Sequence, residues 1–169
     1  AKVFNLKQMA AALAYLQDNG LTEYGELEKK AAETTDCFHV LSDRIKQTEN
    51  AMNTNRELKT ATVQYARTRP VFEKYKAAKY SRKFLAEHEA DIELYRAAQA
   101  DLKRLLDGAK LPKMDVLKEE GRKLAEQKRK LYAEYQRVRR DMQEVNTAKA
   151  NIDYLLGYAG QDKKKEQER

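Results

Sequence analysis

The chain has 169 residues, of which 36% are charged and 41% apolar, and its formal net charge is +7. No apolar run approaches the roughly 18 residues that a membrane span needs, so this composition excludes a membrane-spanning helix. Only six glycines and two prolines interrupt a chain rich in Ala, Glu, Lys, Leu and Arg, which are strong helix formers. The expected fold class is therefore all-α, with thin helical packing rather than a compact globule.

The cysteine content and the N-terminal sequence indicate a cellular compartment. Cys37 is the single cysteine, so no internal disulfide is expected, in agreement with a reducing environment. The N-terminal sequence AKVFNLKQ has neither an initiating Met nor a signal-peptide core. We therefore expect a cytoplasmic segment cut from a longer chain.

Two helices are predicted before the first proline. A short helix at 5–19 would begin at Asn5 and stop at Asn19-Gly20, and a long helix at 22–67 would begin at Thr22. In the long helix, apolar or small side chains alternate three and four residues apart, as in a heptad seam with polar interruptions. The seam consists of Leu27, Ala31, Thr34, Phe38, Leu41, Ile45, Thr48, Met52, Asn55, Leu58, Thr62 and Tyr65.

A helical insertion is predicted at 70–107. Pro70 suits the first turn of a new helix, where its missing N–H is not needed. Ser81 is the expected N-cap of a further helix, which ends at Asp107-Gly108.

The clearest pattern follows Pro112. One apolar residue recurs every seven positions and predicts a long helix over 113–156, at Leu117, Leu124, Leu131, Val138, Val145 and Ile152. The partner positions are half polar, among them Gly121, Lys128 and Lys149. Residues 158–169 are polar and without pattern, so we expect this basic and acidic tail to be disordered.

Two long helices of similar length, joined by an insertion, predict one elongated helical domain over residues 1–157. Its expected architecture is a long antiparallel coiled-coil hairpin, with the insertion forming a three-helix bundle at one end. The short first helix would cover the other end.

Catalytic machinery is not expected in this segment. His39 and His88 are the two histidines, and neither has a metal-ligand spacing. Cys37 and His39 stand two residues apart on a helix and would point in different directions. Without a phosphate loop or a nucleophile motif, we expect no enzyme activity, no metal and no cofactor.

The net charge is concentrated in two stretches. Residues 67–83 hold one acid, Glu73, and seven cations that are candidate DNA contacts: Arg67, Arg69, Lys74, Lys76, Lys79, Arg82 and Lys83. Five aromatic residues accompany them and could stack on unpaired bases, namely Tyr65, Phe72, Tyr75, Tyr80 and Phe84. The alternative is that Phe72, Tyr75 and Phe84 form core and that the cations only solvate the surface.

The second stretch lies on the last long helix. Four arginines recur there at roughly helical spacing and could follow a nucleic-acid backbone: Arg122, Arg129, Arg137 and Arg140. Charged solvent faces are also common on coiled coils, so simple solvation is the alternative.

Several blocks of the sequence resemble a known family. They are Phe84-Leu85 with His88, Ile92 and Leu94-Tyr95, then Leu117-Lys118-Glu119-Glu120, Lys130 to Tyr135 and Thr147 to Ile152. Over about residues 20–157 the chain resembles the C-terminal helical region of relaxases, the mobilisation nucleases of conjugative and mobilisable elements.

The resemblance implies a division of labour. A relaxase nicks DNA with a tyrosine and a histidine-bound metal in its N-terminal domain, and no histidine cluster here matches that site. The segment would then be an accessory domain that binds DNA, or other proteins of the transfer complex, beside the nuclease. The alternative function is a coiled-coil stalk for protein interaction or homo-oligomerisation, without nucleic acid.

Overall fold

The computed structural model describes the backbone of residues 2–19 and 24–167. Within these ranges the structure is all-helical, with α1 at Lys2–Asp18, α2 at Tyr24–Ala77, α3 at Arg82–Glu87, α4 at Glu89–Leu106 and α5 at Met114–Gln167. The chain divides into two compact units. Unit 1 comprises Ala1–Ile45 and Leu131–Arg169, and unit 2 comprises Lys46–Lys130.

Unit 1 is held by an aliphatic core. Leu27 of α2 packs with Val145 and Ala148 of α5, while Leu41 and Ile45 pack with α5 nearer its start. Residue numbers rise along α2 as they fall along α5, so the two helices are antiparallel within this unit. Burial of these side chains is the main force that joins them.

Helix α1 completes unit 1. Its Tyr15 and Leu16 pack against the cluster around Leu27. Lys30 of α2 donates a hydrogen bond of 2.6 Å to Asn19, just beyond the end of α1, and its ammonium lies 5.7 Å from the centre of the Tyr15 ring. These contacts attach α1 to the first turns of α2.

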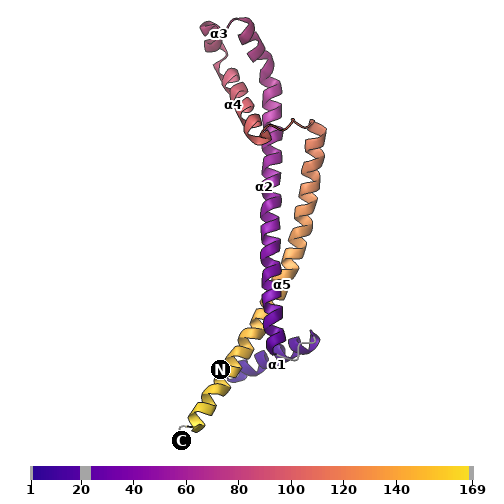
Figure 1. The fold of residues 1–169 in the computed structure, drawn as a ribbon, viewed down its shortest axis with the longest axis vertical. Helices are drawn as coiled ribbons and strands as arrows, with labels where there is room; N and C mark the ends of the chain where they lie inside the picture. The colour runs from indigo at the N-terminus through magenta and orange to yellow at the C-terminus, as the bar shows by residue number, and fades with distance from the viewer. Residues whose placement is uncertain (1, 20–23, 168–169) are drawn as a thin grey trace. The chain divides into compact units, whose positions relative to one another are not determined.

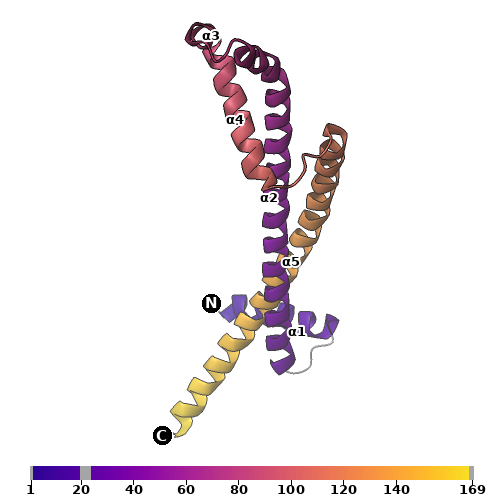
Figure 2. The same cartoon turned by 45° about the horizontal axis from the view of Figure 1, so that its top comes forward.

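Unit 2 combines α2, α4 and the start of α5. In Figures 1 and 2, α4 runs back along the C-terminal part of α2, and α3 lies at the turn between them. Tyr65 and Phe72 of α2 stack on Tyr95 of α4. Helix α5 contacts α2 at Asn55, whose side-chain Nδ2 donates a hydrogen bond of 2.9 Å to the Leu117 carbonyl. This core therefore combines aromatic and polar contacts with buried aliphatic side chains such as Ile92 and Leu117.

The predicted seams are confirmed by burial. All twelve seam positions of α2 are buried or half-buried, and on α5 Leu117, Leu131, Val138 and Val145 are buried. Threonine hydroxyls in the α2 seam, such as Thr34 and Thr62, donate to the carbonyl four residues earlier. The backbone thus satisfies these hydroxyls, which is why polar residues are tolerated in the seam.

The predicted helix break at Pro70 is wrong, because α2 continues to Ala77 with Pro70 inside it. A proline there removes one helical hydrogen bond and costs about 3 kcal/mol. The loss is offset by packing on the same stretch, where Phe72 stacks on Tyr95 with ring centres 4.1 Å apart and Tyr75 is 5% exposed. The insertion proper is therefore a turn at 78–81 followed by α3 and α4.

Other helix ends agree in part with the sequence. Ser81 caps α3 as predicted, accepting a hydrogen bond from the Phe84 amide, but the single helix predicted from Ser81 to Asp107 is interrupted at His88, between α3 and α4. Helix α4 ends where Asp107 and Gly108 take positive φ values of 45° and 84°. Helix α1 begins at Lys2, so Asn5 lies inside it rather than at its cap, since no residue of Lys2–Phe4 disfavours a helix. The predicted cap at Thr22 lies outside the described residues.

Helix α5 also continues beyond its predicted end. Its backbone is helical to Gln167, although the sequence predicts disorder for residues 158–169. Residues 161–167 are Gln, Asp, Lys and Glu and include no proline or glycine, so nothing in them breaks the helix.

Candidate nucleic-acid interface

The basic segment at 67–83 forms one end of unit 2. It comprises the last turns of α2, the turn at 78–80 and the start of α3. Lys79 and Tyr80 adopt left-handed backbone conformations with φ of 53° and 58°, which are uncommon for residues other than glycine. The Tyr80 amide donates to the Tyr75 carbonyl over 3.0 Å, and the Tyr80 ring packs edge-on against Tyr75. These contacts hold the turn in place.

All seven predicted cations of this segment are exposed: Arg67, Arg69, Lys74, Lys76, Lys79, Arg82 and Lys83. Within the described residues none of them forms an ion pair with a carboxylate, and Glu73 is the one acid of the segment. Their charges are therefore available to an anionic ligand.

The cations do not share one face of α2. At 3.6 residues per turn, positions seven apart differ by about 20° around a helix, whereas positions two apart differ by about 200°. Arg67 and Lys74 thus lie on one flank of the buried stripe, and Arg69 and Lys76 lie on the other. A ligand on one side of the segment would meet one of these pairs, together with cations of the turn and α3.

The aromatic residues of the segment are packed against each other and against α4. Phe72 and Tyr65 stack on Tyr95, and Tyr75 stacks on Phe84. Tyr75 is buried, and Tyr65, Phe72 and Phe84 are half-buried. Tyr80 is 56% exposed. The core alternative therefore describes Phe72, Tyr75 and Phe84, and of the five only Tyr80 presents most of its ring to a ligand.

Tyr95 is the centre of this aromatic cluster. Its hydroxyl donates to the Tyr65 hydroxyl over 3.4 Å. This hydrogen bond and the burial of the ring favour the neutral phenol and raise the pKa of Tyr95 to about 12. The sequence placed Tyr95 in a helix, but its role could not be found without the fold, because its partners lie 23 and 30 residues away.

The four arginines of α5 fall in different units, and all four are exposed. In unit 2, Arg122 donates two hydrogen bonds to Glu119, of 2.8 and 3.1 Å, and lies 3.7 Å from Glu126. The Arg122 guanidinium lowers the pKa of Glu119. The positive charge of Arg122 is in turn largely compensated by Glu119 and Glu126. Arg129 in unit 2, and Arg137 and Arg140 in unit 1, form no such pair within the described residues.

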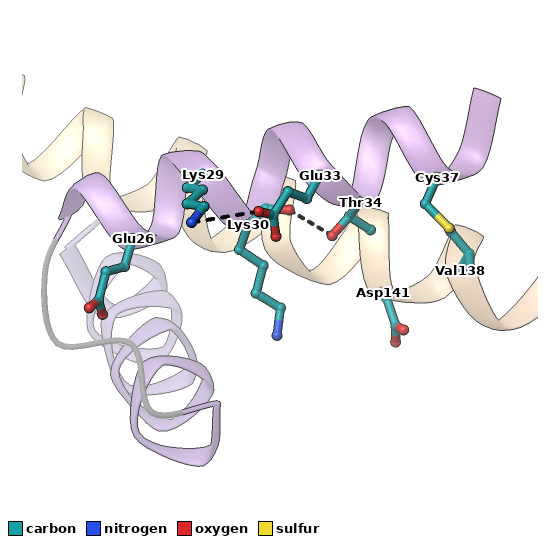
Figure 3. A pocket seen from close by; sticks show the side chains of 8 residues that line it. All are labelled: Glu26, Lys29, Lys30, Glu33, Thr34, Cys37, Val138 and Asp141. Carbon is teal, nitrogen blue, oxygen red and sulfur yellow. Dashed lines mark hydrogen bonds and ion pairs between the residues drawn. The ribbon is translucent and has the colours of Figure 1, made fainter. Parts of the chain in front are cut away.

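A cleft of about 590 Å³ lies beside Cys37 in unit 1. Figure 3 shows Cys37 directed towards Val138 of α5, and Lys30 and Asp141 also line the cleft. Lys29 and Glu33 form an ion pair of 3.9 Å there. The lining mixes both signs of charge, and nothing in it selects a ligand.

No group of three or more His, Cys, Asp or Glu side chains capable of holding a metal occurs in the described part of the chain. Of the helices there, none is both long and apolar enough to cross a membrane.

Sequence reasoning missed two cations of unit 2, Arg56 and Lys59, which line a cleft beside Gly121 together with Lys118. Arg56 and Lys59 lie outside the two basic stretches, so counting charge along the chain gave them no weight. The sequence signal that could have pointed to this cleft is Gly121, a glycine in the seam of α5.

Compared with known proteins, the chain matches no protein-family model, no curated protein and no solved structure.

Proposed function

We propose that this chain is a non-catalytic helical module that binds DNA through the basic segment at 67–83. One observation carries the proposal: the segment holds seven exposed cations and a single acid, and none of the cations has a carboxylate partner in the part of the chain that the structure describes. Lysine and arginine side chains neutralise phosphates and release counterions, which supplies most of the affinity of a sequence-independent DNA contact.

The proposed contact is with phosphates rather than with bases. Most aromatic rings of the segment are engaged in packing within unit 2, and Tyr80 is the candidate for a single stacking contact. The expected binding therefore has little sequence preference and depends strongly on salt.

The resemblance supplies the proposed setting. The module would be an accessory domain of a DNA-mobilisation relaxase in the cytoplasm, and it would hold DNA or transfer-complex proteins beside an upstream nicking domain. The proposed architecture remains an antiparallel coiled-coil hairpin with a three-helix bundle at one end. The antiparallel pairing of α2 with α5 inside each unit supports the hairpin.

The test is a titration of fluorescent single- and double-stranded oligonucleotides at two salt concentrations. The variant Lys76→Gln, Lys79→Gln, Arg82→Gln and Lys83→Gln should bind at least roughly tenfold more weakly. Its plot of log affinity against log salt should be flatter by up to about three units, because up to four phosphate contacts are lost.

A matched control neutralises three lysines and one arginine elsewhere, with Lys7→Gln, Lys46→Gln, Lys113→Gln and Arg139→Gln. These four side chains are exposed and lie outside the proposed contact. Equal losses in the two variants would show that only net charge matters, and undiminished affinity of the first variant would remove the segment from the interface.

A protein-interaction module is the second candidate, and α1 favours it. Leu6 and Leu13 are 66% and 55% exposed, and Met9 between them is 36% exposed, so three apolar side chains at helical spacing face away from the core. If self-association buries this face, sedimentation velocity should detect a dimer that Leu6→Ser with Leu13→Ser abolishes. A monomer at high concentration would exclude self-association.

A further inference from the structure

A cleft in unit 2 is built around Gly121 of α5, opposite Asn55 of α2. Asn55 is 5% exposed. A Cβ placed on Gly121 would come within 2.8 Å of the Asn55 Oδ1 and 3.3 Å of the Lys59 Nζ. The missing side chain of Gly121 therefore leaves the space in which the Asn55 amide and the Lys59 ammonium lie.

The cleft has a volume of about 400 Å³, and its charged lining is entirely cationic. Arg56 and Lys59 reach it from α2, and Lys118 and Arg122 reach it from α5. No aspartate or glutamate is among the lining residues. Four cations from two helices thus converge on one cavity within a single unit.

The charges of these four residues are not equivalent. Arg122 is engaged by Glu119 and Glu126, as described above. Arg56, Lys59 and Lys118 have no carboxylate partner within the described residues, although carboxylates pair with cations elsewhere along α5. Lys59 is also half-buried, so part of its hydration is lost without a compensating charge.

An anion in the cleft would supply that missing charge. A tetrahedral phosphoryl group can accept hydrogen bonds from several ammonium and guanidinium donors at once. A volume of about 400 Å³ is within the range of small-ligand sites.

We propose that the cleft between Asn55 and Gly121 is a phosphate-binding site, with Lys59, Lys118 and Arg56 as its principal ligands. It is separate from the basic segment at 67–83, and it does not depend on that segment binding DNA. The phosphate could belong to a small free molecule or to a nucleic-acid backbone, and the same chemistry recognises both.

The test is calorimetric titration of the full chain with inorganic pyrophosphate at low salt. Lys59→Gln with Lys118→Gln should weaken binding at least roughly tenfold, because charge-assisted hydrogen bonds from both helices are lost. The matched control is Lys46→Gln with Lys123→Gln, which removes one exposed lysine from each of the same helices, outside the cleft. It should change affinity less than about twofold. Circular dichroism should show that both variants remain helical.

Absence of pyrophosphate binding at millimolar concentration would overturn the site, and so would equal losses in the two variants. A second arm repeats the titration with a single-stranded oligonucleotide. If Lys59→Gln with Lys118→Gln weakens oligonucleotide binding as well, the bound phosphate belongs to a backbone, and if only pyrophosphate binding is lost it belongs to a small molecule. The variant at Lys76, Lys79, Arg82 and Lys83 should retain pyrophosphate binding, so failure of the DNA proposal is distinguishable from failure of this one.

Discussion

The two units use the same antiparallel pairing of α2 with α5 but fill it with different chemistry. In unit 1 the seam fully buries Leu27 and Val145 and packs Phe38 against Tyr135, with ring centres 5.0 Å apart. In unit 2 the seam carries Asn55 and an ion pair of 3.3 Å between Lys128 and Glu49, and the aromatic cluster around Tyr95 closes its end. Aliphatic burial stabilises a pair of helices without fixing one register, whereas polar and aromatic contacts require particular partners.

The unit whose seam carries Asn55 and the Lys128–Glu49 ion pair also carries the candidate binding surfaces. The exposed cations at 67–83 and the cleft at Gly121 both lie in unit 2. Polar partners that fix the register of two helices also fix the relative positions of the charged side chains on them. We therefore read unit 1 as the stabilising part of the chain and unit 2 as the part that positions charge.

The largest expected effect comes from removing the core of one unit at a time. Tyr95→Ala should lower the free energy of unfolding by about 3–5 kcal/mol, and Leu27→Ala should lower it by about 2–5 kcal/mol, because both side chains are buried. Urea unfolding followed by circular dichroism would measure both losses. Hydrogen exchange should show lost protection in α4 for the first variant and in α1 for the second.

Exposed valines on α2 provide matched controls. Val63→Ala in unit 2 and Val40→Ala in unit 1 remove side chains that are 58% and 57% exposed, and each should change stability by less than about 0.5 kcal/mol. If Tyr95→Ala and Leu27→Ala lowered protection across the same set of amides, the contrast between the units would not hold.

A smaller effect is expected at the polar seam of unit 2. Gly121→Ala should destabilise the chain by about 1 kcal/mol, since the added methyl meets the Asn55 Oδ1 at 2.8 Å. In an Asn55→Ala background the same change should instead stabilise by about 1 kcal/mol, because alanine is the better helix former. A double-mutant cycle by urea unfolding measures this change of sign. Equal effects in both backgrounds would mean that Gly121 and Asn55 are not in contact.

The smallest effect is confined to alkaline solution. The pKa of Tyr95 is raised from 10.0 to about 12 by its hydrogen bond to Tyr65 and by burial, so the folded state holds its proton more tightly than the unfolded state. The stabilisation from this group is complete below pH about 10 and is lost as the pH rises from about 10 to about 12. Urea unfolding at several pH values over this range should show that the free energy of unfolding falls less steeply with pH for Tyr95→Phe than for the unmodified chain. A fall of the same slope would assign the alkaline loss to other tyrosines.

The sequence alone determined the helical class, most of the seam and several helix ends. Heptad spacing identified the buried side of α2 and α5, because burial on a helix repeats with its turn. Ser81 and Asp107-Gly108 were also found from sequence, since caps depend on a few neighbouring residues. The exposure of the seven cations at 67–83 followed from the same local pattern.

Tertiary structure decided what depends on residues distant in the chain. Helix α2 continues through Pro70 because Phe72 and Tyr75 gain partners in α3 and α4, which local propensity cannot include. Phe72, Tyr75 and Phe84 are packed for the same reason, whereas Tyr80 is 56% exposed. The meeting of Asn55 with Gly121, 66 positions apart, depends on the register of two helices, and that register is fixed only when their side chains pack.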